Sequence, residues 1–280
     1  MEQREINISV NSEKPIFFSH IVDTPSPTHN TFHIHDYLEI YIYLTGDVDF
    51  IVGEKYLSLK RGDVIITTQN VLHKPIIKSR KKYERFFIGI PLDSLSYIDR
   101  GENPLSFAHK DKILISLESD KVGHILTILN KISEQLENNE NQNIYLAFAY
   151  FLQFLDVLNS AFNSNKFNIE SRKTTVPDLI NDVLQYIDTH STKIDSVNSL
   201  AETFHVNPSY LSSLFSAATH VNLKQYLTNK KISEAKNMLL TDRAISDIAY
   251  ECGFSSCSHF ISVFKQITGK TPRKYRLEVK

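Results

Sequence analysis

Two stretches near the C-terminal end of the chain repeat one pattern, "LAETFHVNPSYLSSLF" and "IAYECGFSSCSHFISVF". In each, an apolar residue and an alanine precede a turn position, a capping residue and a helix with an aromatic side chain near its end. Ala201 and Ala249 let two helices cross closely, and Gly253 takes a turn conformation that other residues resist. His205 stands at the glycine position of the first stretch, which weakens that turn slightly. The repeat therefore predicts two helix-turn-helix units.

The periodicity of the apolar residues divides the 280-residue chain into four parts. Residues 1–120 contain short alternating segments, such as "YLEIYIYL" and "GDVIITT", that are typical of the strands of a barrel or sandwich. Over residues 121–162 the spacing changes to threes and fours, which predicts an antiparallel helical hairpin. Residues 163–175 have no period and form the predicted linker, and residues 176–280 are predicted to be helical. We therefore expect an α+β multi-domain protein with an N-terminal β-barrel and hairpin and a C-terminal all-α double helix-turn-helix domain.

Positive charge is concentrated at the C-terminal end. Residues 1–174 carry 19 basic and 22 acidic side chains, whereas residues 221–280 carry 11 and 5. Such an excess suits a polyanion such as DNA, although a basic run can also be an ordinary solvated surface. No uninterrupted apolar run has the length of a membrane span, and the first residues lack the apolar segment of a signal peptide. We expect a cytoplasmic protein without a membrane partner.

The second unit and its flanks, "AISDIAYECGFSSCSHFISVFKQITGKTPRKYR", together with the helix "LKQYLTNKKISEAKNMLL", resemble the DNA-binding domain of the AraC/XylS family of bacterial transcription regulators. The resemblance covers residues 178–276 and implies seven helices. Two recognition helices, 208–218 and 256–267, would enter successive segments of the major groove. The resemblance implies contacts to base edges from Ser209, Ser212, Ser213, Cys257, Ser258 and Ser262. Candidates for phosphate contacts are Lys224, Lys230, Lys265, Lys270, Arg273 and Lys274.

All six base-edge positions carry short side chains, where family members often carry arginine, glutamine or lysine. Bidentate readout of guanine is therefore not available from them, and we expect DNA shape and deformability to carry much of the specificity. For each basic residue, a solvated surface charge is the alternative to a phosphate contact.

The N-terminal half resembles the cupin-type sensor domain that many family members carry. The stretch "HIHDYLEIYIYLTG" reproduces the first cupin motif, and "GDVIITTQNVLH" resembles the second, with Thr68 and Asn70 in place of its proline and glycine. The period-two geometry of a strand places polar and aromatic residues on one face and an apolar row, which protein must cover, on the other. The candidate effector-binding residues are His33, His35, Glu39, Tyr41, Tyr43 and His73.

These features lead us to expect a homodimeric activator of a sugar-utilisation operon that binds operator DNA, a small carbohydrate and RNA polymerase and is not an enzyme. The hairpin is the expected dimer interface, unless its apolar stripe packs on its own barrel. No metal is expected, but a metal at His33, His35, Glu39 and His73 is an alternative, because imidazole and carboxylate at this spacing suit zinc. A metal-dependent cupin enzyme fused to a DNA-binding domain is the second functional hypothesis.

Overall fold

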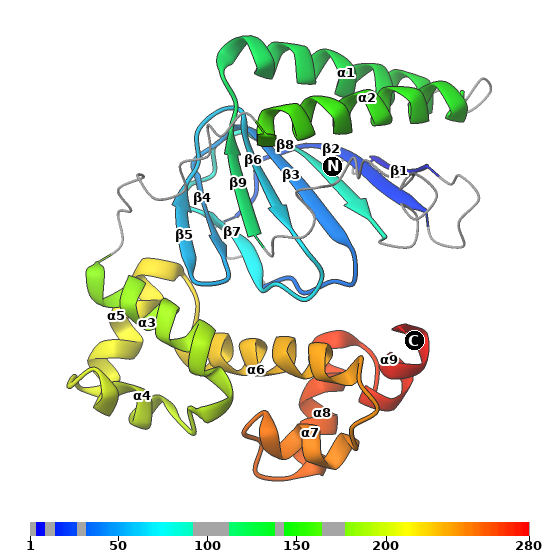
Figure 1. Cartoon of the computed structure of the whole chain (residues 1–280). Helices are drawn as coiled ribbons and strands as arrows, with labels where there is room; N and C mark the ends of the chain where they lie inside the picture. Colours follow the sequence, from blue (N-terminus) through cyan, green and yellow to red (C-terminus); the bar gives the residue numbers. More distant parts are fainter. Residues whose placement is uncertain are drawn as a thin grey trace.

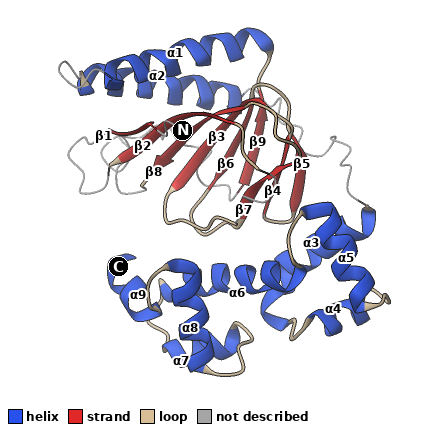
Figure 2. Cartoon of the chain, turned by 180° about the vertical axis from the view of Figure 1, so that it is seen from behind, coloured by secondary structure: helices blue, strands red, loops and turns tan. Residues whose placement is uncertain are grey.

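The structure is a computed structural model that describes residues 4–8, 15–26, 32–91, 112–137, 143–163 and 177–279. Within this part of the chain, a pair of helices covers one side of a β-structure and a helical domain lies against its other end (Figures 1 and 2). The fold class predicted from the sequence is confirmed. The predicted linker, apart from Asn163, lies outside the described residues.

Nine strands in the described residues form two antiparallel sheets. The six-stranded sheet has the order β1 (Arg4–Ile8), β2 (Ile16–Asp23), β8 (Tyr83–Ile90), β3 (Leu38–Thr45), β6 (Asp63–Thr67) and β9 (Lys112–Ser116). The three-stranded sheet has the order β5 (Lys55–Ser58), β4 (Val48–Val52) and β7 (His73–Ile77). Side chains from both sheets meet in one buried, largely aromatic cluster that fills the barrel.

Strand β3 shows how the alternation of residues separates two cores. Ile40 and Ile42 face outward and pack under the helices α1 (Ser119–Glu137) and α2 (Ile144–Asn163), whereas Tyr41 faces the barrel interior. The apolar face of this strand is thus covered by protein, as expected from its sequence. Phe151 and Leu155 of α2 are fully buried in the same core. The apolar stripe of the hairpin therefore packs on its own barrel.

By length and composition alone, α2 could cross a membrane, since its mean hydropathy reaches 1.3. No membrane-spanning segment was expected from the sequence. Phe151, Phe154 and Leu155 are fully buried in the core under the sheet and α1, which accounts for the apolar character of this helix.

Seven α-helices and one 3-10 turn make up the described C-terminal part, in agreement with the family resemblance. They are α3 (Asp178–His190), η3 (Ser191–Lys193), α4 (Val197–Thr203), α5 (Pro208–Thr219), α6 (Leu223–Leu239), α7 (Ile245–Glu251), α8 (Cys257–Thr268) and α9 (Pro272–Val279). Helices α4 and α5 form the first helix-turn-helix unit, α7 and α8 form the second, and α6 runs between them beneath the barrel (Figure 1).

The turns of the two units have the same left-handed backbone conformation. The φ angle is 71° at Gly253 and 53° at His205. A glycine adopts this region freely, whereas a residue with a Cβ is strained there. His205 therefore adopts the left-handed turn conformation that the sequence repeat predicts, and this conformation is strained for a residue with a Cβ.

We expect His205→Gly to stabilise the protein by about 1 kcal/mol, because the side chain at this position is exposed and only the strain would be lost. The midpoint of urea unfolding measures this change. Gly253→Ala is the opposite case, since a Cβ there would lie 2.7 Å from the Thr192 carbonyl oxygen, and it should destabilise. Destabilisation by His205→Gly would contradict the prediction.

The barrel and the first helix-turn-helix unit share one hydrophobic core. Ile51, Tyr56 and Ile76 project from the outer face of the three-stranded sheet into a cluster with residues of α3, α4, α5 and α6. The Tyr226 hydroxyl of α6 donates a hydrogen bond to the Gly53 carbonyl oxygen at 2.9 Å. The helical domain is therefore packed against the barrel and not merely tethered to it.

Candidate functional site

Two histidines from different parts of the barrel are brought together by backbone pairing. The amide of His33 donates to the His73 carbonyl oxygen at 2.9 Å, and the amide of His73 donates to the His33 carbonyl oxygen at 3.3 Å. The amide of Asn70 donates to the His35 carbonyl oxygen at 2.9 Å. The segment before β3 thereby runs beside the segment before β7, and the Glu39 side chain of β3 reaches both His35 and His73.

His35, Glu39 and His73 form a compact group, here called the histidine cluster. The Nε2 atom of His35 lies 2.8 Å from Oε2 of Glu39, and Nε2 of His73 lies 3.3 Å from the same oxygen. The two Nε2 atoms are 3.3 Å apart. Glu39 and His73 are buried, and the His35 side chain is only 10% exposed. Three polar atoms thus converge on one point at the end of the barrel.

Each imidazole is fixed from behind by a backbone carbonyl. Nδ1 of His35 lies 3.0 Å from the Tyr37 carbonyl oxygen, and Nδ1 of His73 lies 2.9 Å from the Val71 carbonyl oxygen. A carbonyl only accepts hydrogen bonds, so both Nδ1 atoms carry a proton, an assignment made from these partners. Each ring therefore directs Nε2 towards Glu39. The Tyr37 ring also stacks on His35, with a centroid distance of 3.9 Å.

The charges of the cluster are strongly coupled. Burial would raise the pKa of Glu39, but His73 and His35 together hold that pKa below its usual range. Burial would lower the pKa of His73, but the attraction of Glu39 outweighs it and the pKa is raised. Burial lowers the pKa of His35 in spite of its hydrogen bond to Glu39. Glu39 is therefore held in its ionised form by the two imidazoles beside it, while burial and the Glu39 charge act in opposite directions on the pKa of each histidine.

The geometry of the three atoms requires a hydrogen or a cation among them. A ring that is neutral and carries its proton on Nδ1 presents a lone pair on Nε2, and both Nε2 atoms lie within 3.3 Å of Oε2 of Glu39 and of each other. Two acceptors at this distance repel each other unless a hydrogen or a cation lies between them. A donor group of a ligand, a second proton or a metal ion would each complete the contact.

Thr67 adds a fourth polar group beside the cluster. It lies directly opposite Glu39 in the register of β3 and β6, so both side chains are on the same face. Thr67 is 1% exposed, and among the described residues its hydroxyl has no hydrogen-bond partner. A buried hydroxyl of this kind is available to a water molecule or a ligand hydroxyl. The sequence analysis missed it, although Thr67 follows Asp63 and Ile65 on the inward face of its strand.

The cluster has the dimensions of a metal site. In a tetrahedral zinc site with bonds of about 2.0–2.1 Å, neighbouring ligand atoms are about 3.3 Å apart. The three distances in the cluster are 2.8, 3.3 and 3.3 Å. Both rings are held through Nδ1, as metal-binding histidines usually are. His35, Glu39 and His73 would hold such an ion, which would supply a Lewis acid at a position facing Thr67.

The other predicted effector-binding residues lie outside the cluster. His33 is exposed, and its ring centroid is 6.0 Å from that of His73. Tyr41 and Tyr43 lie further along β3 and are buried in the barrel. Their hydroxyls are engaged, with Tyr41 bonded to the Tyr83 hydroxyl and Tyr43 donating to the Gly46 carbonyl oxygen. A ligand would reach these hydroxyls only by displacing those partners.

The predicted base-edge residues lie on α5 and α8. Both helices are capped, by the Asn207 side chain at α5 and by the Ser256 side chain at α8. Four of the six predicted residues are exposed and the remaining two, Ser212 and Cys257, are half-buried. The exposed four are Ser209, Ser213, Ser258 and Ser262.

Two longer side chains on these helices were missed by the sequence analysis. Tyr210 of α5 and His259 of α8 are both exposed, and each directly precedes a buried core residue, Leu211 or Phe260. The two positions are equivalent in the repeat, which was the signal available in the sequence. They offer a phenol and an imidazole where the predicted residues offer only short groups.

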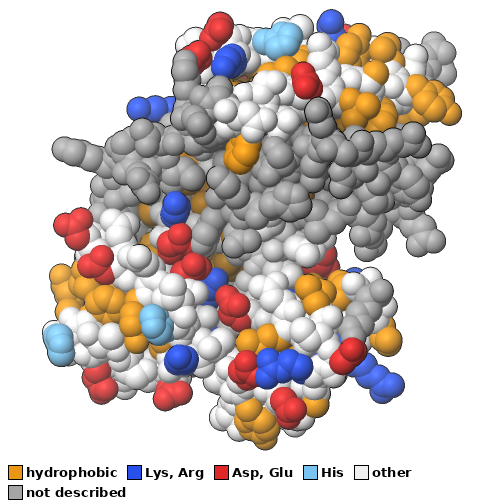
Figure 3. All heavy atoms as spheres, in the orientation of Figure 1, with side chains coloured by type: hydrophobic (Ala, Val, Ile, Leu, Met, Phe, Trp, Pro, Cys, Tyr) orange, Lys and Arg blue, Asp and Glu red, His pale blue; other side chains and the backbone are white. Residues whose placement is uncertain are grey.

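The six predicted phosphate-binding residues differ in availability. Lys224, Lys265, Arg273 and Lys274 are exposed. Lys270 forms an ion pair with Glu278. Lys230 is buried, and its ammonium lies 2.8 Å from Asp188 and 3.1 Å from Glu234, so we remove it from the set. On the face shown in Figure 3, acidic and basic side chains are mixed over the helical domain.

Family models match both parts of the chain. A family model described as an AraC-like ligand binding domain matches residues 17–155, and one described as a helix-turn-helix domain matches residues 200–278. Together they match well over half of the chain.

The melibiose operon regulatory protein of Escherichia coli is 24% identical over 259 residues, which are 88% of this chain and 83% of that protein. An uncharacterized HTH-type transcriptional regulator of Staphylococcus aureus is 37% identical over 100 residues, 35% of this chain and 13% of that protein. Among solved structures, ToxT from Vibrio cholerae has a TM-score of 0.38 at 16% identity, covering 93% of this chain and 98% of that one.

Proposed function

Because this chain belongs to the AraC family of DNA-binding transcriptional regulators and carries a ligand-binding domain, we propose that it activates a sugar-utilisation operon when a small carbohydrate binds at the histidine cluster. In this proposal it acts in the cytoplasm as a homodimer, contacts RNA polymerase at the promoter and is not an enzyme. The observation that carries the proposal is the convergence of His35, Glu39 and His73 on one buried point, beside a Thr67 hydroxyl that has no hydrogen-bond partner in the described part of the chain. The name of the melibiose regulator supports the choice of a sugar.

A sugar suits the cluster because its hydroxyl groups both donate and accept. One hydroxyl can donate to the Glu39 carboxylate beside His35, and another can bond to Thr67. The Tyr37 ring, stacked on His35, offers an aromatic face beside these groups. The expected effector is therefore polyhydroxylated and carries no negative charge, which the ionised Glu39 would repel.

The test is a reporter driven by the promoter region next to the gene, in cells supplied with melibiose, other disaccharides or single hexoses. We expect one of these sugars to raise expression, and the same sugar should bind the purified protein in calorimetry. A protein that binds the promoter DNA while no sugar changes reporter expression would contradict the carbohydrate assignment.

The metal reading is favoured by one observation, the match of the three cluster distances to a zinc site. If it is right, untagged protein contains about one equivalent of zinc, nickel or manganese, and His35→Ala removes it. A measured metal would also reopen the enzyme hypothesis, which an assay for turnover of bound sugars would test. Protein that is free of metal after purification without chelators would leave the organic effector as the preferred ligand.

We expect Tyr210→Ala and His259→Ala each to reduce discrimination between operator and non-operator DNA by about 1–3 kcal/mol, because they are long exposed side chains in the first turns of the recognition helices. Competition gel shifts at fixed salt measure this difference. Ser258→Ala is the matched control and should cost little, since its hydroxyl is short. Equal losses for Ser258→Ala and His259→Ala would contradict this ranking.

The proposed dimer uses the outer face of α2. Tyr145 is 82% exposed and Leu146 is 37% exposed, and hydrophobic side chains are visible over the hairpin in Figure 3. We expect Tyr145→Asp with Leu146→Asp to give a folded monomer by analytical ultracentrifugation. A double variant at exposed sites of the helical domain, Gln225→Asp with Gln266→Asp, should remain dimeric. A dimeric Tyr145→Asp, Leu146→Asp protein would place the interface elsewhere.

A further inference from the structure

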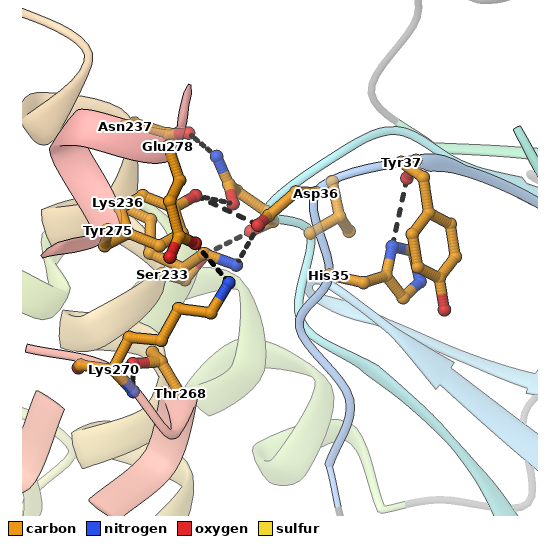
Figure 4. Close-up of polar contacts among 12 residues, drawn as sticks. His35, Asp36, Tyr37, Ser233, Lys236, Asn237, Thr268, Lys270, Tyr275 and Glu278 are labelled. Atoms are coloured by element: carbon orange, nitrogen blue, oxygen red, sulfur yellow. Dashed lines mark hydrogen bonds and ion pairs between the residues drawn. The ribbon is translucent and has the colours of Figure 1, made fainter. Parts of the chain in front are cut away.

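The two segments that position the histidine cluster also contact α6 and α9, the helices that precede and follow the second helix-turn-helix unit. Figure 4 shows His35 directed towards the barrel, while the next residue, Asp36, is directed towards α6 and α9. On the neighbouring segment, Asn70 contacts the same two helices three residues before His73.

Asp36 accepts from two groups of the helical domain. The Lys236 ammonium lies 2.7 Å from Oδ1 of Asp36, and the Tyr275 hydroxyl donates to the same oxygen at 3.0 Å. Lys236 is almost fully buried, and its ammonium also lies 5.1 Å from the centre of the Tyr275 ring. A buried ammonium needs such an anionic partner, so the loss of Asp36 would be felt directly by α6.

Asn70 makes the second set of contacts. Its Nδ2 donates to Oδ1 of Asn237 at 2.8 Å, and its carbonyl oxygen accepts from the Ser233 hydroxyl. Its backbone has φ 64°, the left-handed region that asparagine tolerates better than most residues. Asparagine thus keeps a glycine-like backbone where the cupin motif has glycine, and adds a side chain that reaches the helical domain.

Tyr275 carries these contacts to the second recognition helix. Its ring packs against Phe264 of α8, with a centroid distance of 5.6 Å, while its hydroxyl binds Asp36. The ion pair between Lys270 and Glu278 further holds α9 to the end of α8 (Figure 4). A displacement of Asp36 would therefore be transmitted to α8 through one side chain.

The two helix-turn-helix units are attached to the barrel by different chemistry. The first unit shares a hydrophobic core with the outer face of the three-stranded sheet, which includes Ile51 and Ile76. The helices on either side of the second unit, α6 and α9, contact the barrel through hydrogen bonds and one ion pair. Polar contacts at a domain boundary open at lower cost than a shared core, because water can replace them.

We propose that these polar contacts form a latch, made of Asp36, Asn70, Ser233, Lys236, Asn237 and Tyr275, that couples the state of the histidine cluster to the position of the second recognition helix. The latch rests on the proposed function in that the cluster is its input. His35 and Asp36 are adjacent, and Asn70 is bonded to His35 through its amide. Any ligand that turns the His35 ring acts on both halves of the latch, while the first unit stays fixed.

Hydrogen exchange of the full-length protein tests the latch without an inducer or DNA. We expect Asp36→Asn to speed amide exchange in α9 and in the C-terminal half of α8 at least tenfold, while exchange in α4 and α5 is unchanged. Lys236→Met should do the same, and it leaves no unpaired buried charge that could unfold the domain. Asp47→Asn is the matched control, because Asp47 is also bonded to a lysine and a serine hydroxyl but within the barrel.

The coupling is tested by adding Glu39→Gln, which releases the His35 ring from a carboxylate. It should speed exchange in α9 of the otherwise unchanged protein and have no further effect in the Asp36→Asn background. If Glu39→Gln leaves α9 exchange unchanged while Asp36→Asn speeds it, the cluster is not coupled to the latch. If neither variant affects α9, there is no latch. Both outcomes are independent of whether a sugar is the inducer, which the reporter assay decides.

Discussion

Raising the salt concentration from 50 to 200 mM should weaken operator binding by the proposed dimer roughly ten-thousand-fold. Four basic residues on each protomer are exposed on or beside the recognition helices, namely Lys224, Lys265, Arg273 and Lys274. Each phosphate neutralised contributes a slope of about −0.9 to the logarithm of affinity against the logarithm of salt concentration, so eight contacts give a slope of about −7. Fluorescence anisotropy over a salt series measures that slope.

Charge reversal separates the proposed contacts from general charge effects. Arg273→Glu should make the slope shallower by about two, because one contact is lost from each protomer. Arg80→Glu changes net charge equally at an exposed site in the turn between β7 and β8 and should leave the slope nearly unchanged. A slope of about −2 for the unaltered protein, or equal effects of the two substitutions, would show that the residues contacting phosphate have been misassigned.

Glu39→Gln should abolish induction while operator binding in the absence of inducer is retained. The substitution keeps the size of the side chain and removes the charge that orients both histidines. Loss of a hydrogen bond to a charged group costs about 1.5–3 kcal/mol, so effector affinity should fall roughly 10- to 150-fold. The dose response of the reporter and calorimetry with the inducing sugar both report this loss.

Glu84→Gln provides the matched control for this experiment. Glu84 also contacts a histidine, His20, at 3.1 Å, but on strands β8 and β2 away from the cluster. The Glu84→Gln protein should respond to the inducer like the unaltered protein. An unaltered dose response in the Glu39→Gln protein would move the effector site away from the cluster.

The sequence predicted the elements of this protein better than their contacts. Alternation along β3 identified its covered face, and the repeated helix-turn-helix pattern predicted where α5 and α8 lie, because both signals are local. Tyr41 and Tyr43 share a strand face with Glu39, but period alone does not tell how deep a residue lies in a barrel. Both fill the interior, where the Tyr41 hydroxyl is bonded to Tyr83 of β8 and the Tyr43 hydroxyl donates to Gly46 in the turn after β3.

The burial of two lysines in the helical domain could not be predicted from the sequence. Lys230 and Lys236 lie on α6, whose sequence is polar enough to be solvated on most faces. In the structure α6 runs beneath the barrel, so Lys230 pairs with Asp188 and Lys236 pairs with Asp36. Such pairs join residues 42 and 200 positions apart in the chain, and no local pattern in one sequence reports them.

The hydrophobic core shared by the barrel and the first helix-turn-helix unit also limits how such a regulator can be recombined. A chimera that joins this helical domain to another sensor would leave the partners of Ile51, Tyr56 and Ile76 uncovered, unless the new sensor presented matching apolar residues on its three-stranded sheet. The unit that must be transplanted in a chimera is therefore larger than the helical domain that the sequence boundary defines. It comprises the helical domain together with the strand face on which α3 rests.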